Sequence, residues 1–250
     1  MIRVRKRSLW QPLQSLKKSK YGGDRGRRKK MIKCCIFDLD GTLLYTLTTI
    51  THYVNLVLTR HGIRNITEEQ CRIFIGDGAR QLISRSLMAA GIDDSEMTES
   101  ILNEYNGEYN KNTNYLTRAY DGIDELLSSL KDRGVKLAVL SNKPDTTTVL
   151  VVREIFSDAF DKIYGARAGV PLKPAPDALI NLIGELSLTP SEVMYIGDTG
   201  VDMQCARAAG VAAAVGVAWG YRSVEELLKT GADIIADAPV NILREVERRA

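Results

Sequence analysis

Residues 34–43 read CCIFDLDGTL, an apolar run typical of a buried strand that ends in two aspartates two positions apart. Gly41 then turns the chain, and Thr42 adds a hydroxyl beside the two carboxylates of Asp38 and Asp40. Magnesium-assisted phosphoryl transfer through an aspartyl-phosphate needs such a set, because one carboxylate attacks phosphorus while neighbouring oxygens hold the metal ion. A simple Asp-Gly turn after a strand explains the same residues, so partners further along the chain must decide.

The remaining sequence describes a globular chain with a basic N-terminal segment. Its 250 residues, 44% hydrophobic and 26% charged, suffice for one α/β domain with an insertion. Residues 1–30 carry twelve Lys or Arg against one Asp, a net +11, so the overall +3 leaves −8 on residues 31–250. We expect residues 1–30 to be a flexible tail that precedes the true start at Met31, directs the protein to an organelle, or binds nucleic acid.

Membrane insertion and a metal site built on cysteine or histidine are not expected. The longest nearly apolar stretch, residues 211–220, is too short to span a bilayer, which favours a cytoplasmic protein with no membrane partner. The four cysteines show no zinc-ligand spacing and should be reduced and buried. Two histidines are too few for a multi-histidine metal site.

Apolar runs and amphipathic patterns alternate along most of the chain, which is typical of a parallel sheet with helices on both faces. The predicted strands are residues 33–37, 136–140, 162–164, 193–196, 212–217 and 233–235. The predicted helices between them are residues 123–133, 145–156, 176–186, 201–209, 224–229 and 240–247. The expected fold class is therefore α/β, with a Rossmann-like parallel sheet as its core.

Residues 45–118 break this alternation. No convincing strand is found there, and four consecutive helices are predicted at residues 47–60, 68–75, 79–90 and 94–112. We expect an all-helical cap domain inserted into a core of residues 31–44 and 119–250. Ligands bind at the carboxyl ends of the strands in such sheets, so an insertion after the first strand hangs over the site and acts as a lid.

Polar residues recur at later strand ends and in one loop. Ser141 and Asn142 follow the second strand of the sheet, Lys173 lies in a loop, and Asp198 and Asp202 follow the fourth strand. Each alone has an ordinary structural role, because serine caps helices, lysine lies in solvent and aspartate begins helices. Together with the first two aspartates they supply a nucleophile, a phosphate-binding hydroxyl, a cation and metal-binding carboxylates at one sheet edge.

With these four motifs in order, residues 31–250 resemble phosphatases of the haloacid dehalogenase superfamily. The resemblance implies that Asp38 is the nucleophile and a ligand of Mg²⁺. Asp40 would be the general acid and base, and would bind the metal through its backbone carbonyl. Asp198 would complete the protein's part of the metal site, and Asp202 would orient the ligands or coordinate the ion directly.

The same resemblance places the groups that would bind phosphate. Ser141 and the backbone amides near Gly41 and Asn142 would hold the phosphate oxygens, with Thr42 beside them. Lys173 would balance the charge on the nucleophile and on the transferring phosphoryl group. The resemblance therefore implies a phosphate site built mainly from the loops that follow the first two strands of the sheet.

Several segments bear on the substrate. Thr42, residues 75–78 (IGDG), residues 141–144 (SNKP) and residues 220–221 (GY) resemble the phosphoglycolate phosphatase group. This implies a small phosphomonoester, with 2-phosphoglycolate as the first candidate. The cap loop that ends at Arg80 is expected to face the substrate, and Arg80 either pairs with a substrate carboxylate or is a surface arginine.

One position departs from that group. Tyr45 and Thr46 stand where an Asp followed by Ser or Thr is usual, so a charge is missing at the hinge into the cap. A β-phosphoglucomutase-like phosphosugar mutase and a pyrophosphatase are alternatives, as is nucleic-acid binding through the basic tail. The expected partner is a small phosphorylated metabolite rather than nucleic acid, and the expected state is a monomer or homodimer.

Overall fold

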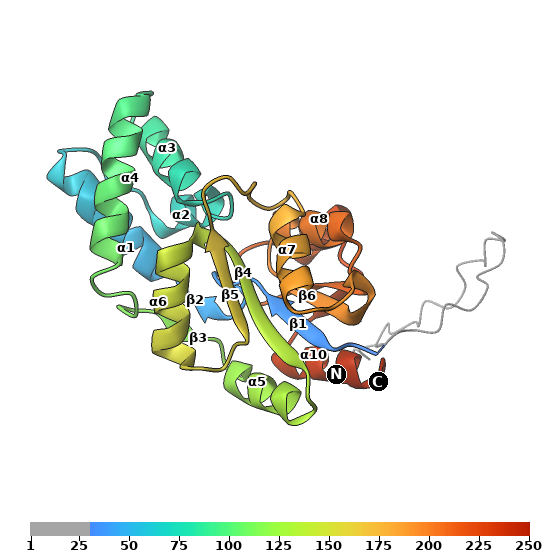
Figure 1. Cartoon of the computed structure of the whole chain (residues 1–250). Helices are drawn as coiled ribbons and strands as arrows, with labels where there is room; N and C mark the ends of the chain where they lie inside the picture. Colours follow the sequence, from blue (N-terminus) through green and yellow to red (C-terminus); the bar gives the residue numbers. More distant parts are fainter. Residues whose placement is uncertain (1–30) are drawn as a thin grey trace, which may run out of the picture.

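The computed structural model describes residues 31–250, and the predictions for the basic tail lie outside the described residues. A six-stranded parallel sheet forms its centre (Figure 1). From one edge to the other the strands are β5 (Lys162–Ala166), β4 (Lys136–Pro144), β1 (Cys34–Phe37), β6 (Val193–Gly197), β7 (Ala213–Val217) and β8 (Ile234–Ala236). These are the six predicted strands, and the expected α/β fold is confirmed.

Side chains of β1 point alternately to the two faces of the sheet, Cys35 and Phe37 to one, Cys34 and Ile36 to the other. The first face is covered by α5 (Ile123–Asp132), α6 (Asp145–Phe156) and α10 (Pro239–Glu247). The second face is covered by α7 (Asp177–Glu185), α8 (Gly200–Ala209) and α9 (Val224–Thr230), and a 3₁₀ turn, Pro190–Glu192, precedes β6. All four cysteines are buried and free, as expected. Within residues 31–250, none of the helices has the length and apolar character needed to span a membrane.

The cap segment, residues 45–118, projects beyond one end of the sheet (Figure 1). Its helices are α1 (Leu47–Arg60), α2 (Glu68–Phe74), α3 (Ala79–Ala89) and α4 (Ser95–Tyr109). A small antiparallel pair, β2 (Leu44–Tyr45) with β3 (Arg118–Ala119), lies where the chain enters and leaves this segment. Sequence reasoning does not predict this pair, because strands of two residues are too short to show an alternating pattern.

Strand β4 continues four residues past its predicted end. Its pairing with β5 runs from Ala138 opposite Lys162 to Pro144 opposite Ala166, with a shift in register between Leu140 and Pro144. The residues in between are therefore held by the sheet, and α6 begins without a side-chain cap hydrogen bond. This extension fixes the directions of Ser141 and its neighbours, and the helix-capping interpretation of that serine is wrong.

Candidate active site

The carboxyl ends of β4, β1 and β6 lie side by side in the sheet. Phe37 of β1 pairs with Val139 of β4 on one side and with Ile196 of β6 on the other. Asp38 and Asp198, which follow soon after these residues, therefore leave the sheet at nearly the same level. Because of this register, polar residues that are far apart in the sequence lie in one cluster at the end of the sheet.

Three buried aspartates form the acidic centre of the site. Carboxylate oxygens of Asp38, Asp198 and Asp202 all lie within 4.8 Å of one another. Burial, and next the charge of Asp202, raise the pKa of Asp38 to about 7, while burial and the charge of Asp38 raise the pKa of Asp198. Like charges buried at this spacing need a cation, and Mg²⁺ prefers oxygen ligands. The residues present thus fit a magnesium ion.

Gly41 and Gly220 allow the backbone to lie close against Asp198. A Cβ atom on Gly41 would be 2.2 Å from Asp198 Oδ2, and one on Gly220 would be 2.2 Å from Asp198 Cβ. Gly41 also has a φ of +89°, which favours glycine. The side chain of Asp198 is held in place by Tyr221 N, which donates to Oδ2 at 2.8 Å, and by Thr42 Oγ1, which donates to Oδ1 at 3.3 Å.

The structure does not bring Gly41 and Thr42 to the predicted phosphate site. Gly41 N donates to the carbonyl of Leu44 at 2.8 Å, and Thr42 N donates to the carbonyl of Leu39 at 3.3 Å. Neither residue is among those that line the cavity described below. Because their amides close the turn after β1, these two residues shape that turn and position Asp198 instead.

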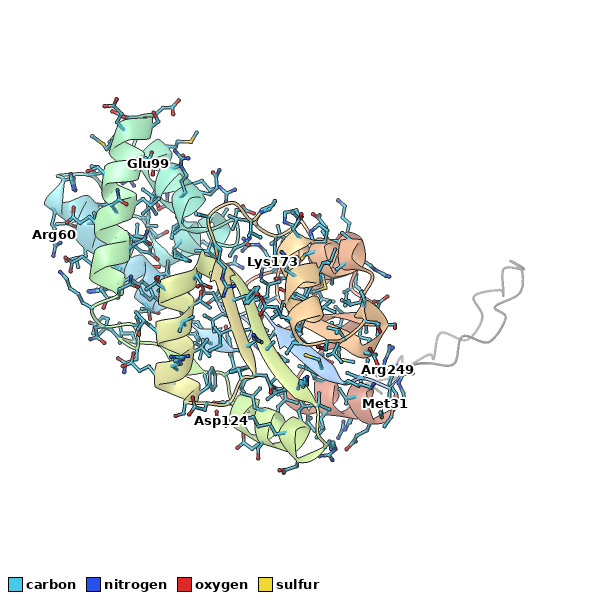
Figure 2. The ribbon with its side chains drawn as sticks, in the orientation of Figure 1. Met31, Arg60, Glu99, Asp124, Lys173 and Arg249 are labelled. Atoms are coloured by element: carbon cyan, nitrogen blue, oxygen red, sulfur yellow. The ribbon has the colours of Figure 1, made fainter. Side chains whose placement is uncertain are left out.

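Lys173 bridges two of the aspartates. Its Nζ donates to Asp38 Oδ1 and to Asp202 Oδ1, both at 2.7 Å, and also to the Leu140 carbonyl at 3.1 Å and the Tyr195 hydroxyl at 3.2 Å. Burial lowers the pKa of Lys173, but the charges of Asp202 and Asp38 outweigh it, so the pKa is raised and the ammonium stays charged. Lys173 lies where the cap segment meets the end of the sheet (Figure 2). Sequence reasoning missed Tyr195, because a tyrosine inside a buried strand has the pattern of a core residue.

The raised pKa of Asp38 predicts a stability that depends on pH and on magnesium. A folded-state pKa near 7, above the ordinary 3.8, means that the folded protein binds more protons than the unfolded chain between these values. Stability is therefore lost as the pH rises through about 7. We expect the Tm of the EDTA-treated protein to be about 5 °C lower at pH 8 than at pH 5.5, and Mg²⁺ to raise the Tm more at pH 8.

Carboxylates outside the site provide the control for this measurement. Glu69, Glu104 and Glu185 are exposed carboxylates with pKa values held below the ordinary 4.5 by hydrogen bonds from neighbouring basic groups. Their contributions to stability are lost only at lower pH, so they do not change between pH 5.5 and pH 8. An equal shift in Tm on adding Mg²⁺ at both pH values would contradict the expected competition between protons and metal at Asp38.

Ser141 and Asn142 have different roles in the structure. Asn142 Nδ2 donates to the carbonyls of Gly76 and Lys173 at 2.9 and 3.0 Å, and its Oδ1 accepts from Lys173 N at 2.9 Å. Asn142 therefore ties the cap loop to the loop that carries Lys173. Ser141 Oγ accepts from Lys143 N at 3.2 Å, and within residues 31–250 its O–H hydrogen is not donated to another group. That hydrogen is available to a phosphate oxygen.

Lys143 is a candidate functional residue that sequence reasoning misses. Its Nζ lies 3.3 and 3.2 Å from the two carboxylate oxygens of Asp40 and 4.2 Å from the ring centre of Tyr109. Burial lowers the pKa of Lys143, but the charge of Asp40 outweighs it, so the pKa is raised and the ammonium stays charged. The available signal is the place of Lys143 in the segment of residues 141–144 (SNKP), all four of which line the cavity described next.

A cavity of about 50 Å³ lies between the sheet and the cap segment. The charged and hydroxyl groups on its core side are those of Asp38, Asp40, Ser141, Lys143, Lys173 and Thr199. The larger side chains on its cap side are those of Ile50, Ile75, Leu82 and Tyr105. The cavity is thus charged where the sheet ends and mostly apolar where the cap segment covers it.

Arg80 lies outside this cavity. Its guanidinium bonds Glu99 of α4 at 2.6 Å, and 61% of its side chain is exposed. Because successive helix residues are about 100° apart, α3 turns Ala79 and Leu82 toward the cavity and Arg80 away from it. Glu99 lies on α4 in the part of the cap segment remote from the sheet (Figure 2). Arg80 therefore lies away from the cavity and fits the alternative of a surface arginine.

The loop after β7 connects the site to the cap segment. Tyr221, which lines the cavity, accepts a hydrogen bond at its hydroxyl from Thr46 N at 3.0 Å. Arg222 donates to the carbonyl of Ile75, at the end of α2, at 2.8 Å. Tyr45, the unusual residue at the hinge, is not among the residues that line the cavity. Contacts across the hinge are made through Tyr221 and Arg222, and also through Tyr45, whose ring packs edge-on against that of Tyr120 with centroids 6.1 Å apart.

The fold and the site define an α/β enzyme whose polar residues meet at the carboxyl edge of a parallel sheet, under a helical insertion. Residues 35–216 match the family model described as haloacid dehalogenase-like hydrolase. The chain therefore belongs to the haloacid dehalogenase-like hydrolase family. This match includes the segments that carry Asp38, Ser141, Lys173 and Asp198.

Named relatives cover most of the chain. A phosphoglycolate phosphatase of Haemophilus influenzae (strain 86-028NP) is 32% identical over 207 residues, 80% of this chain and 92% of the relative. An N-acetylmuramic acid 6-phosphate phosphatase of Pseudomonas aeruginosa is 29% identical over 224 residues, 88% of this chain and 97% of the relative. The solved structure of a predicted phosphoglycolate phosphatase from Haemophilus somnus has a TM-score of 0.80 and 27% identity, and covers 86% of this chain and 97% of its own. The family resemblance, the fold and the enzyme class expected from the sequence are confirmed.

Proposed function

We propose that the protein is a magnesium-dependent phosphatase that hydrolyses a small phosphomonoester, with 2-phosphoglycolate as the first candidate and the cap segment as a lid. The observation that carries this proposal is the pair of 2.7 Å contacts through which Lys173 joins Asp38 to Asp202, beside Asp198. The relative from Haemophilus influenzae, a phosphoglycolate phosphatase, supports the choice of substrate. A cytoplasmic location and a monomeric or homodimeric state stay predictions from the sequence.

Asp38 is the proposed nucleophile. One of its oxygens bonds to phosphorus as the P–O bond to the ester oxygen breaks, and Asp40 gives a proton to that leaving oxygen. Water then bonds to phosphorus, Asp40 takes a proton from it, and the bond between phosphorus and Asp38 breaks to release phosphate. Ser141 donates a hydrogen bond to a phosphate oxygen, and Lys173 offsets the negative charge throughout.

Asp38, Asp198 and the backbone carbonyl of Asp40 are the proposed protein ligands of Mg²⁺. When bound, the ion supplies the positive charge that lets a carboxylate approach a phosphate dianion. Asp202 is proposed to orient the site, because its two oxygens together accept four hydrogen bonds, whereas those of Asp198 accept two. Asp202 Oδ1 accepts from Lys173 Nζ at 2.7 Å, and its Oδ2 accepts from Thr199 N at 3.0 Å and Thr199 Oγ1 at 2.6 Å.

A comparison of phosphorylated metabolites tests this proposal. In the presence of Mg²⁺ we expect kcat/KM for 2-phosphoglycolate to exceed that for N-acetylmuramic acid 6-phosphate, glucose 6-phosphate, AMP and pyrophosphate by at least about tenfold. The reason is size, because a cavity of about 50 Å³ between sheet and cap segment admits a small ester most easily. The measurement is the rate of free phosphate release, with EDTA in place of Mg²⁺ as the control.

Each alternative has its own result in the same assay. Faster hydrolysis of N-acetylmuramic acid 6-phosphate would assign the protein to the activity named for the relative from Pseudomonas aeruginosa. An isomerised sugar phosphate without free phosphate would identify a mutase. Full activity in EDTA would reject the dependence on magnesium.

A further inference from the structure

Lys143 has unused donor capacity, in contrast to the second buried lysine of the site. Lys173 Nζ donates to four acceptors at 2.7 to 3.2 Å. Lys143 Nζ donates to the carboxylate of Asp40, at 3.2 and 3.3 Å, and lies over the ring of Tyr109, whose hydroxyl also interacts with the ammonium. These distances exceed the about 2.7–2.9 Å that is usual for an ammonium and a carboxylate. Because an ammonium has three N–H groups, Lys143 can accommodate a further acceptor.

The ammonium of Lys143 lies beside Asp40, and so beside the place that the leaving alcohol would take. Lys143 and Asp40 both line the cavity, and Asp40 is the group proposed to protonate the leaving oxygen. In 2-phosphoglycolate a single carbon separates that oxygen from the carboxylate. A carboxylate on the alcohol part would therefore come within reach of Lys143 Nζ while the phosphoryl group remains beside Asp38.

On its cap side, as far as the described residues show, the cavity offers such a carboxylate the Tyr105 hydroxyl and the backbone of Gly76, Gly78 and Ala79 at the start of α3, but no cation. The cap side carries Ile50, Ile75 and Leu82, and an ionised carboxylate that is buried against apolar groups without a partner is strongly disfavoured. In the part of the chain that the structure describes, Lys173 is the other cation that lines the cavity, and its donors are occupied. Lys143 is thus the group best placed to bind a second negative charge on the substrate.

We propose that Lys143 binds a carboxylate on the alcohol part of the substrate, so that the enzyme selects phosphate esters of small hydroxy acids. This inference rests on the proposed phosphatase function of the same site. Tyr109 of α4 contacts Lys143 from the cap segment, and Asp40 contacts it from the core. The ammonium is therefore held between the two parts of the structure that enclose the substrate.

Two substrates that differ in one charge provide the test. They are 2-phosphoglycolate and 2-hydroxyethyl phosphate, in which CH₂OH replaces the carboxylate. For the unchanged enzyme we expect kcat/KM to favour 2-phosphoglycolate by about 10- to 100-fold, the usual worth of a charged hydrogen bond. In Lys143→Met this ratio should fall at least about tenfold, mainly through KM for 2-phosphoglycolate, and Lys143→Arg should retain more of it.

Controls separate this role from a general loss of function. Lys162→Met removes an exposed lysine that pairs with Glu185, and should leave the ratio of the two kcat/KM values unchanged. Inhibition of Lys143→Met by inorganic phosphate, together with its Tm, shows whether the phosphate site and the fold are intact. An intact variant whose ratio has fallen supports the proposal.

Three results would overturn it. Equal kcat/KM values for the two esters in the unchanged enzyme would show that no carboxylate is recognised, while the phosphatase function would stand. A fall by the same factor for both esters in Lys143→Met would mean that the lysine acts only through Asp40. A fall in the ratio in Arg80→Ala but not in Lys143→Met would place recognition in the cap segment. Absence of phosphate release from either ester by the unchanged enzyme would instead reject the proposed function itself.

Discussion

Asp38→Asn is expected to lower kcat for phosphate release by at least about 10⁴-fold at saturating Mg²⁺. The amide has nearly the shape of the carboxylate, but its neutral oxygen is too weak a nucleophile to bond to phosphorus. Asp38 also accepts the 2.7 Å hydrogen bond from Lys173, so the substitution removes one of the two charges that this lysine joins. Steady-state and single-turnover assays with 2-phosphoglycolate measure the loss.

The fold of Asp38→Asn should be preserved. Asp38 is buried beside Asp198 and Asp202, so removing its charge relieves repulsion, and the Tm in EDTA at pH 8 should be equal to or above that of the unchanged protein. The matched control is Asp124→Asn on the exposed first turn of α5 (Figure 2), which should retain full activity. Near-normal turnover by folded Asp38→Asn would exclude the aspartyl-phosphate mechanism.

Most of the fold can be predicted because apolar residues recur along its helices and strands with the spacing typical of each. The helix expected at residues 47–60 is α1, Leu47–Arg60, and the strand expected at residues 193–196 is β6, Val193–Gly197. The extension of β4 to Pro144 is different, because it depends on pairing with β5 rather than on its own sequence. Strands that pair with each other are distant in the sequence, so no local sequence pattern predicts where their pairing ends.

The sequence predicts the site only for residues that directly follow a strand. Asp38, Ser141 and Asp198 could be brought together in advance, because the carboxyl ends of parallel strands share one edge. The direction in which each side chain points could not be predicted from the sequence. Asn142 turns to the backbone of two loops, and Arg80 turns to solvent, since these directions depend on the continuation of β4 and on the rotation of α3 about its axis.

Lys173→Met is expected to remove both stability and activity. Methionine fills similar space, but it leaves Asp38 and Asp202 without the ammonium that lies 2.7 Å from each. Removing one partner of a buried charge pair costs about 3–5 kcal/mol, so we expect the free energy of unfolding in EDTA at pH 8 to fall by that amount. Losing the charge beside the nucleophile should also lower kcat by about 10³-fold.

Magnesium should separate these two effects of Lys173→Met. Saturating Mg²⁺ should restore much of the free energy of unfolding, because the ion offsets the charge of the same carboxylates. It should not restore kcat, because the lysine donates directly to the nucleophile Asp38. Adding Asp38→Asn to Lys173→Met should likewise recover stability in EDTA but no activity, since one uncompensated carboxylate is gone. A free energy of unfolding at pH 8 that Lys173→Met leaves unchanged would mean that another group balances the acidic centre.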